Sequence, residues 1–456
     1  MKKIFPLSLI VIITSALYAN AVGGGFLRDD FPQIMENRWI TGARYIPEIF
    51  SSTLWDYYEG SFISGPSNYY RPLMHMIYMA GYHIFGQSPA GFHLVNIVFH
   101  NLNAVLVFLI ASLIFKRGGG GAPQSSLVAD TTAPGFFGSA FFPLAAALIF
   151  AAHPVNVEAV AWVGAVSELA FTSFCLAAFY LYALEGKGFR GAAFYILSVI
   201  LYGLALFTKE TAIVLPVLLA AYDLAVRKMP LTAIKRYIPF LAVAGVFFYI
   251  RSNIVGPLSA QHAMTAYQYL LSVAFLTAQY IEKLVFPFNL KLYYPFHGPQ
   301  SLGELFSHEV FAALGAAAAL AFSLYRSSSL GRLILCSLWI LIPLSPAVLM
   351  VKYIQGEWAF ASRYLYLSSA GFAILCASWL KDLFEARPVE RLAPGRRKAA
   401  AAALALMVLV PFAADTVMAA RAWRDEFSYW KKAAEDAPGS PNTHASMGFA
   451  YADRGL

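Results

Sequence analysis

The sequence is poor in charged residues. Asp, Glu, Lys and Arg make up 13% of its 456 residues, whereas hydrophobic residues make up 59%. Soluble domains usually carry about 25% charged residues, so this composition excludes a soluble multidomain chain and indicates a polytopic membrane protein. The formal net charge is +8. Because the basic residues cluster in short loops between apolar runs, they indicate membrane topology and disfavour binding of nucleic acid.

Cysteine is also scarce. The three cysteines, Cys175, Cys336 and Cys376, lie inside apolar runs, and none of them forms a CxxC pair. This spacing argues against a zinc knuckle and a disulfide framework, and it predicts small core side chains. We also find no internal repeat in the membrane part. A transporter built from repeated halves is therefore a weak alternative for this chain.

The apolar runs predict an all-α protein with about 11 membrane-spanning helices. The first run follows Lys2 and Lys3 and also fits a cleavable signal peptide, but we prefer an uncleaved span. With these lysines inside, the loop at 23–72 lies outside the cytoplasm under either interpretation. The run at 267–286 decides the later topology. The basic residues at 387–398 stay inside only if this run lies along the surface, so we predict an interfacial helix.

Two adjacent aspartates, Asp29 and Asp30, begin the first outer loop. A carboxylate pair just outside a bilayer suits base catalysis on a lipid-borne substrate, and the alternative is a solvated loop start. Adjacent carboxylates repel each other, so both stay ionised only beside a cation, a hydrogen-bond donor or a metal. Arg28 is the nearest cation. The sequence does not distinguish which aspartate would act as the base.

A polar stripe follows in the next span. His93, Asn96, His100 and Asn103 are spaced by three, four and three residues, which places them on one face of a helix. Polar groups in an apolar span must face protein or water. Two interpretations remain open: hydrogen bonds between packed helices, or the lining of a substrate cavity.

Further polar groups interrupt the apolar runs at the same outer face. They are Arg71, His153, Glu158, Glu168, Lys209, Glu210, Arg363 and Tyr364. Arg363 lies among aromatic residues at the membrane boundary, where its guanidinium suits a lipid phosphate. Snorkelling or an ordinary loop ion pair is the alternative. Lys209 is costly in hydrocarbon unless it is paired or reaches a headgroup phosphate.

The C-terminal part changes character. Residues 1–420 form the membrane domain, whereas residues 421–456 are more charged and predict the first helices of a tetratricopeptide repeat region outside the cytoplasm. A single partial repeat cannot bury its own apolar face. We therefore expect a longer solenoid in the full-length protein, with a protein partner bound through the repeats.

Together these motifs resemble the membrane glycosyltransferases of the GT-C superfold, most closely the transmembrane and tetratricopeptide-repeat-containing O-mannosyltransferases and their bacterial relatives. The resemblance rests on Asp29-Asp30, Tyr70-Arg71-Pro72-Leu73, Gly91-Phe92-His93 with Asn96 and His100, His153-Pro154, Glu158 to Trp162, Ser167-Glu168-Leu169, Lys209-Glu210, Arg363-Tyr364-Leu365-Tyr366 and the repeat. It implies transfer of a mannose-like sugar from a polyprenyl-phosphate donor to a hydroxyl of a protein or glycan acceptor, at the outer face of a bacterial inner membrane.

Chemical roles follow for these residues. A hydroxyl needs a base to become a nucleophile, and we assign that role to Asp29 or Asp30. The leaving phosphate gains charge, which Arg363, Lys209 and Tyr364 are placed to stabilise. Arg71, His93, Asn96, His100, His153, Glu158, Glu168 and Glu210 are expected to line the cavity. A divalent metal, Mg²⁺ or Mn²⁺, held by Asp30 and Glu158 is an open addition. A non-catalytic repeat scaffold is the main rival function.

Overall fold

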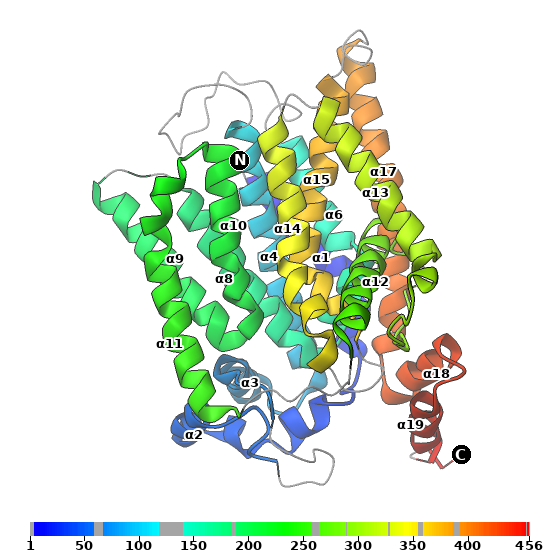
Figure 1. The fold of residues 1–456 in the computed structure, drawn as a ribbon. Coiled ribbons are helices and arrows are strands. Elements are labelled where there is room, and N and C mark those ends of the chain that lie inside the picture. Colours follow the sequence, from blue (N-terminus) through cyan, green and yellow to red (C-terminus); the bar gives the residue numbers. More distant parts are fainter. Residues whose placement is uncertain are drawn as a thin grey trace.

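The computed structural model describes residues 4–58, 67–117, 140–184, 186, 188–256, 264–288, 290–326, 329–353, 359–385, 393–452 and 454–455 (Figure 1). Every regular element within these ranges is a helix, and they contain no strand. The predicted all-α class is confirmed.

The α-helices of the membrane domain are α1 (Ile4–Leu17), α2 (Ile46–Ser51), α3 (Pro72–Phe85), α4 (Pro89–Arg117), α6 (Phe141–Ala152), α7 (Val157–Ala161), α8 (Val166–Ala183), α9 (Gly188–Thr208), α10 (Leu215–Tyr222), α11 (Ile238–Ile254), α12 (Ala266–Val285), α13 (His308–Arg326), α14 (Leu330–Leu349), α15 (Tyr366–Glu385) and α17 (Pro394–Ala419). The α-helices after it are α18 (Glu426–Asp436) and α19 (Pro441–Ala452). The short 3₁₀- and π-helices are η1 (Ala19–Gly23), η2 (Phe31–Met35), η3 (Arg38–Thr41), η4 (Ala43–Tyr45), η5 (Pro154–Asn156), η6 (Val163–Ala165), η7 (Glu210–Val214), η8 (Asp223–Arg227), η9 (Leu231–Tyr237), η10 (Leu302–Leu305), η11 (Val351–Tyr353), η12 (Ser362–Leu365) and η13 (Ala420–Trp423).

Eight helices in the described ranges are long and apolar enough to cross a membrane, and nine if the pair Phe141–Ala152 and Pro154–Ala161, bent by 51°, is one span. The predicted number was about 11. Two segments account for the difference. Helix α1 has only 14 residues, and the apolar run at 211–226 is divided among η7, α10 and η8, of which α10 has eight residues.

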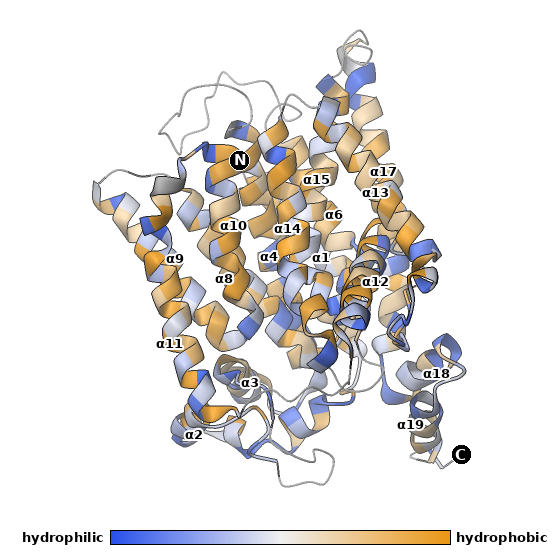
Figure 2. Ribbon diagram, viewed as in Figure 1, coloured by the Kyte–Doolittle hydropathy of each residue, from blue (hydrophilic) through white to orange (hydrophobic). Residues whose placement is uncertain are grey.

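Helix α6 lies at the centre of the bundle and packs against α1, α4, α15 and α17. All of its residues except Phe141 are buried, and many of them are alanines. Small side chains let neighbouring membrane helices approach closely. Figure 2 shows apolar residues along the long helices and polar residues mainly at their ends, as expected for a chain with lipid around its middle.

The two ends of the bundle differ. Helix α2 of the first loop and α3, which follows this loop, lie at the same end as α18 and α19, whereas α1 begins at the opposite end (Figure 1). Helix α12, at the run predicted to be interfacial, is not among the eight candidate spans. Arg363, just before α15, lies at the end of the first loop, because it contacts Trp162, which is bonded to Leu27.

Candidate functional site

The two neighbouring aspartates have different surroundings. The Asp30 carboxylate is fully buried, and its Oδ2 accepts a hydrogen bond of 2.9 Å from the Leu27 backbone N–H. Burial raises the pKa of Asp30 well above its usual range, although this hydrogen bond acts in the opposite direction. Asp29 is only half-buried. Within the described ranges its carboxylate has no hydrogen bond or ion pair, so its oxygens can accept a hydrogen bond from a substrate.

The turn after Trp162 is built around the Asp30 side chain. A Cβ at Gly164 would lie 2.9 Å from Asp30 Oδ1 and 2.8 Å from the Trp162 ring, so glycine is required for this close approach. The Trp162 Nε1–H donates to the Leu27 carbonyl at 3.4 Å. The first loop and the α7–η6 turn therefore hold each other in place.

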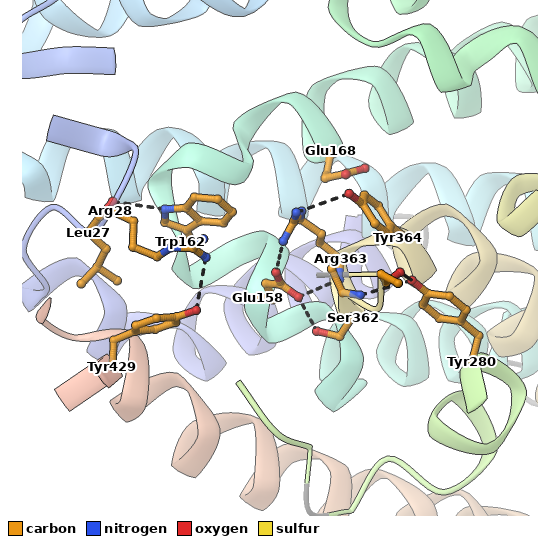
Figure 3. Close-up of polar contacts among 12 residues, drawn as sticks. Leu27, Arg28, Glu158, Trp162, Glu168, Tyr280, Ser362, Arg363, Tyr364 and Tyr429 are labelled. Carbon is orange, nitrogen blue, oxygen red and sulfur yellow. Dashed lines mark hydrogen bonds and ion pairs between the residues drawn. The ribbon is translucent and has the colours of Figure 1, made fainter. Parts of the chain in front are cut away.

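Two guanidinium groups lie against the indole of Trp162. The Cζ atom of Arg28 is 5.2 Å from the ring centroid, and that of Arg363 is 5.3 Å from it. Cation–π contacts of this kind are worth about 0.5–2 kcal/mol each. Burial alone would lower the pKa of Arg28, but Tyr429 and the carboxylates of Asp29 and Glu158 raise it. Figure 3 shows Arg28, Trp162 and Arg363 in one cluster, and Asp29 acts on the same Arg28.

Glu158 is held by Arg363 and its neighbour. Its Oε1 accepts from Arg363 Nη1, and its Oε2 accepts from the Arg363 backbone N–H at 3.0 Å and the Ser362 hydroxyl at 2.8 Å (Figure 3). This arrangement sets the orientation of the guanidinium, whose Nη2 reaches the Tyr364 hydroxyl at 3.4 Å. Glu158 therefore positions Arg363 in this structure.

A cavity opens beside a second buried ion pair. Lys209 donates to Glu168, and its Nζ lies 5.0 Å from the centroid of the Tyr364 ring. The lining residues are Glu168, Phe171, Lys209, Thr211, Val214, Pro343, Ala347, Tyr364 and Leu367. The lining thus contains one charged pair together with several apolar side chains. This combination suits a ligand with a charged head and a hydrocarbon chain.

The third ion pair joins the first loop to the α9–α10 turn. Arg71 donates to Glu210 with both Nε, at 3.1 Å, and Nη2, at 2.7 Å, which is a bidentate pair. Burial would raise the pKa of Glu210, but Arg71 outweighs burial and lowers it to about 2. Burial, Tyr364 and Glu210 raise the pKa of the nearby Tyr69, and together they outweigh the lowering by Arg71 and Arg363. Glu168 acts on both Arg71 and Arg363, so the three ion pairs are electrostatic neighbours.

The polar stripe on α4 points into the protein. Asn96 donates to the Trp162 carbonyl at 2.8 Å, and a His100 ring nitrogen lies 2.6 Å from the Tyr366 hydroxyl. Asn103 contacts the Leu169 carbonyl at 3.0 Å, and His93 lies 3.3 Å from the Gly25 carbonyl. These contacts favour the interpretation as hydrogen bonds between packed helices. Through Asn96 and His93 the stripe also supports the Trp162 turn and the start of the first loop.

His153 is likewise an internal contact. It is fully buried, and its Nε2 lies 3.0 Å from the Leu284 carbonyl at the end of α12. Its ring packs 5.4 Å from Phe372 and 4.7 Å from Phe412, measured between centroids. His153 therefore fixes α12 against the bundle, and it contacts none of the three ion pairs.

The donor set predicted for a metal does not fit one in this arrangement. No group of three His, Cys, Asp or Glu residues in the described ranges is close enough to hold an ion. Both Glu158 oxygens are taken by Arg363 and Ser362, and Asp30 Oδ2 is bonded to the Leu27 backbone. A divalent ion at Asp30 and Glu158 stays a prediction.

Residues near the C-terminus complete the site, and the sequence did not assign them to it. Glu426 accepts a hydrogen bond from the Arg28 backbone N–H, and Tyr429 accepts one from Arg28 Nη1 at 3.2 Å. The Trp423 ring stacks on Trp162, with 6.1 Å between centroids. Helices α18 and α19 pack as a pair, and their assignment to a tetratricopeptide repeat stays a prediction.

Comparisons with known proteins agree with this architecture. The archaeal oligosaccharyltransferase AglB from Archaeoglobus fulgidus, solved with an inhibitory peptide and a dolichol-phosphate, matches with a TM-score of 0.51 at 13% identity, over 97% of this chain and 59% of that one. AglB is a GT-C glycosyltransferase. The chain has a GT-C fold. The predicted resemblance is therefore confirmed.

Similar sequences point to the same group. The protein O-mannosyl-transferase F38B6.6 of Caenorhabditis elegans is 24% identical over 458 residues, which is 98% of this GT-C chain and 60% of the relative. The protein O-mannosyl-transferase TMTC3 of Mus musculus is 28% identical over 224 residues, 48% of this chain and 21% of the relative. The chain thus spans three fifths or less of these relatives. No family model matches it.

Proposed function

We propose that this chain is the membrane part of a glycosyltransferase that moves a mannose-like sugar from a polyprenyl-phosphate donor to a hydroxyl group of a protein or envelope acceptor. The observation that carries the proposal is the Asp29 carboxylate, which has no hydrogen bond or ion pair among the described residues and acts on Arg28 in the cluster with Trp162 and Arg363. The O-mannosyl-transferase names of the relatives support the reaction, and the dolichol-phosphate bound to AglB supports a lipid-linked donor.

Asp29 acts as the general base. A hydroxyl group has a pKa far above 7, so it attacks the anomeric carbon well only when a carboxylate within hydrogen-bond reach takes its proton. Asp29 is half-buried and has no partner in the described ranges, which leaves its oxygens open to an acceptor. Asp30 is fully buried and bonded to the Leu27 backbone. Its task is to hold the turn that carries Asp29.

Arg363 and Lys209 bind the donor phosphate. As the bond to the sugar breaks, the phosphate gains negative charge, and fixed cations nearby lower the barrier. Both cations keep hydrogen-bond capacity beyond their glutamate partners, because a guanidinium has five N–H donors and an ammonium has three. A phosphate can therefore join each pair without separating it. The Tyr364 ring and hydroxyl lie beside both cations.

The apolar side chains of the cavity contact the start of the isoprenoid chain in this proposal. Val214, Pro343, Ala347 and Leu367 line the cavity together with Lys209. A lipid phosphate would thus meet a cation and hydrocarbon in the same place. The distribution of Lys and Arg supports an extracytoplasmic site, and polyprenyl donors of this kind suit a bacterial inner membrane.

Reconstitution tests the proposal. The purified protein is placed in proteoliposomes with a panel of polyprenyl-phosphate sugars, together with candidate acceptor peptides and glycans, and transfer is followed by mass spectrometry. Transfer from one donor supports a glycosyltransferase. A folded protein that transfers from no donor in the panel would favour the rival function, a non-catalytic scaffold whose helical tail binds a partner.

A further inference from the structure

We propose that the tail helix α18 positions the catalytic loop, with Glu426 and Tyr429 holding Arg28 in the backbone conformation that presents Asp29. This inference rests on the proposed function, because it takes Asp29 as the base. Glu426 and Tyr429 are positioning residues in this account. They act through Arg28 and do not touch the substrate.

The contact between α18 and the first loop joins residues about 400 positions apart in the chain. Glu426, 398 positions along the chain, accepts from the Arg28 backbone N–H, and the buried Tyr429 accepts from Arg28 Nη1 at 3.2 Å. The Gly25 N–H donates to the Arg424 carbonyl at 2.7 Å. The Arg28 Cζ also lies 5.9 Å from the Trp430 ring centroid. Backbone and side chain of the loop are thus both bonded to the tail.

Arg28 has an unusual backbone conformation. Its φ angle is +51°, in the left-handed region that residues other than glycine rarely adopt. Such a conformation persists only where the surroundings hold it, and it is often found at functional sites. The next residue is Asp29, whose carbonyl accepts from the Gln33 N–H at 3.0 Å. The backbone conformation of Arg28 therefore determines how the next residue, Asp29, is oriented.

The tail also reaches the donor side of the site. Trp423 stacks on Trp162, and the Cζ atom of Arg363 lies 5.3 Å from the centroid of the Trp162 ring. A shift of α18 would consequently disturb the base and the phosphate-binding cation together. Misplacing a reacting group by about 1 Å can cost about 100-fold in rate. We expect loss of the tail contact to reduce turnover while donor binding is largely kept, because Glu158 still orients Arg363.

The test compares three substitutions in the full chain. Glu426→Ala removes the acceptor for the Arg28 N–H, whereas Glu426→Gln keeps an acceptor oxygen at that position. Glu435→Ala changes an exposed glutamate on the same helix and is the matched control. Each variant is assayed for kcat and donor KM in proteoliposomes, and for hydrogen exchange of residues 24–31 by mass spectrometry. Tyr429→Phe, which keeps the buried ring, replaces Glu426→Ala if that variant does not fold.

We expect Glu426→Ala to exchange faster at 24–31 and to lose roughly 10- to 100-fold in kcat with little change in KM. Glu426→Gln should recover most of the rate, and Glu435→Ala should match the wild type. Wild-type exchange in Glu426→Ala overturns the inference, and so does faster exchange without loss of kcat. If the wild type transfers no sugar, the proposed function fails. Exchange alone then decides whether α18 holds the loop.

Discussion

The Asp30 carboxylate accepts a hydrogen bond from the Leu27 backbone N–H across 2.9 Å. This bond closes the turn at the start of the first loop, and it separates the tasks of two adjacent aspartates. The buried Asp30 is turned toward its own backbone and the Trp162 turn, whereas the half-buried Asp29 has no partner in the described part of the chain. The predictions below follow from this difference and from the ion pairs around it.

Substitution of Asp30 should affect stability more than chemistry. Asp30→Ala leaves the Leu27 N–H without its acceptor in a buried place, which costs about 1–3 kcal/mol of unfolding free energy. Asp30→Asn keeps an acceptor oxygen and should retain turnover within about tenfold of the wild type, because a residue that only holds the turn contributes no proton transfer. Thermal unfolding in detergent and transfer assays measure both effects. Loss of turnover in Asp30→Asn at an unchanged melting temperature would identify Asp30 as the base.

Substitutions in the Arg363–Glu158 pair can distinguish its contribution to stability from its contribution to donor binding. Arg363→Ala leaves a buried carboxylate without its cation, and removing one partner of a buried pair costs about 3–5 kcal/mol. It should also raise the donor KM. Arg363→Lys keeps the charge but loses the paired N–H donors of the guanidinium, so its effect on donor use should be smaller than that of Arg363→Ala.

The double variant Glu158→Gln with Arg363→Ala is the control for this prediction. It removes the unpaired charge, so stability should recover in part while donor use stays poor. If the double variant uses the donor as well as the wild type does, the phosphate is held elsewhere, and Lys209 is then the next candidate.

The Arg71–Glu210 pair should make stability depend on acid pH. The pKa of Glu210 is lowered to about 2 in the folded state, from an ordinary value of 4.5. A lowered carboxyl pKa gives stability that is fully present above the unfolded value and is lost as the pH falls through the folded value. Wild type should therefore lose stability between about pH 5 and pH 2 more steeply than Glu210→Gln does. If the melting temperatures of the two proteins fall equally over this pH range, the Arg71–Glu210 pair is not the source of the pH dependence.

Topology reporters test the orientation of the site. A reporter after residue 440 should report an extracytoplasmic location, and one within 118–135, which lies outside the described residues, a cytoplasmic one. The reason is the placement of Lys and Arg in the inner loops. The tail and the first loop face the same end in Figure 1. A cytoplasmic signal from the reporter after residue 440 would therefore mean that both lie inside the cell.

The fold could be predicted from sequence because hydropathy and the placement of basic residues are local properties. The all-α membrane class and the placement of Asp29 and Arg363 at one end of the bundle followed from them, whereas the GT-C class came from the resemblance of the motifs. The number of spans was less well predicted, because helix breaks such as those on either side of α10 depend on packing. The polar stripe of α4 left two interpretations open, since the spacing of His93 and Asn96 says nothing about whether carbonyl groups or water face them.

The ion-pair partners and the tail contact could not be predicted. Arg363 was recognised as a cation at the boundary, but its pairing with Glu158 joins residues 205 positions apart. Glu426 and Tyr429 were assigned to a repeat region, and only the fold brings them to Arg28. Such contacts depend on how the helices pack, which composition and periodicity do not specify.

The most direct test of the central claim is sugar transfer by wild type and Asp29→Asn in the same proteoliposome assay, with donor binding measured alongside. Asparagine keeps the size of the side chain and removes the basic oxygen. We predict a loss of roughly 10²- to 10⁴-fold in turnover, with donor affinity and melting temperature unchanged. Equal turnover in Asp29→Asn and wild type would contradict the assignment of Asp29 as the base, and with it the catalytic account of this site.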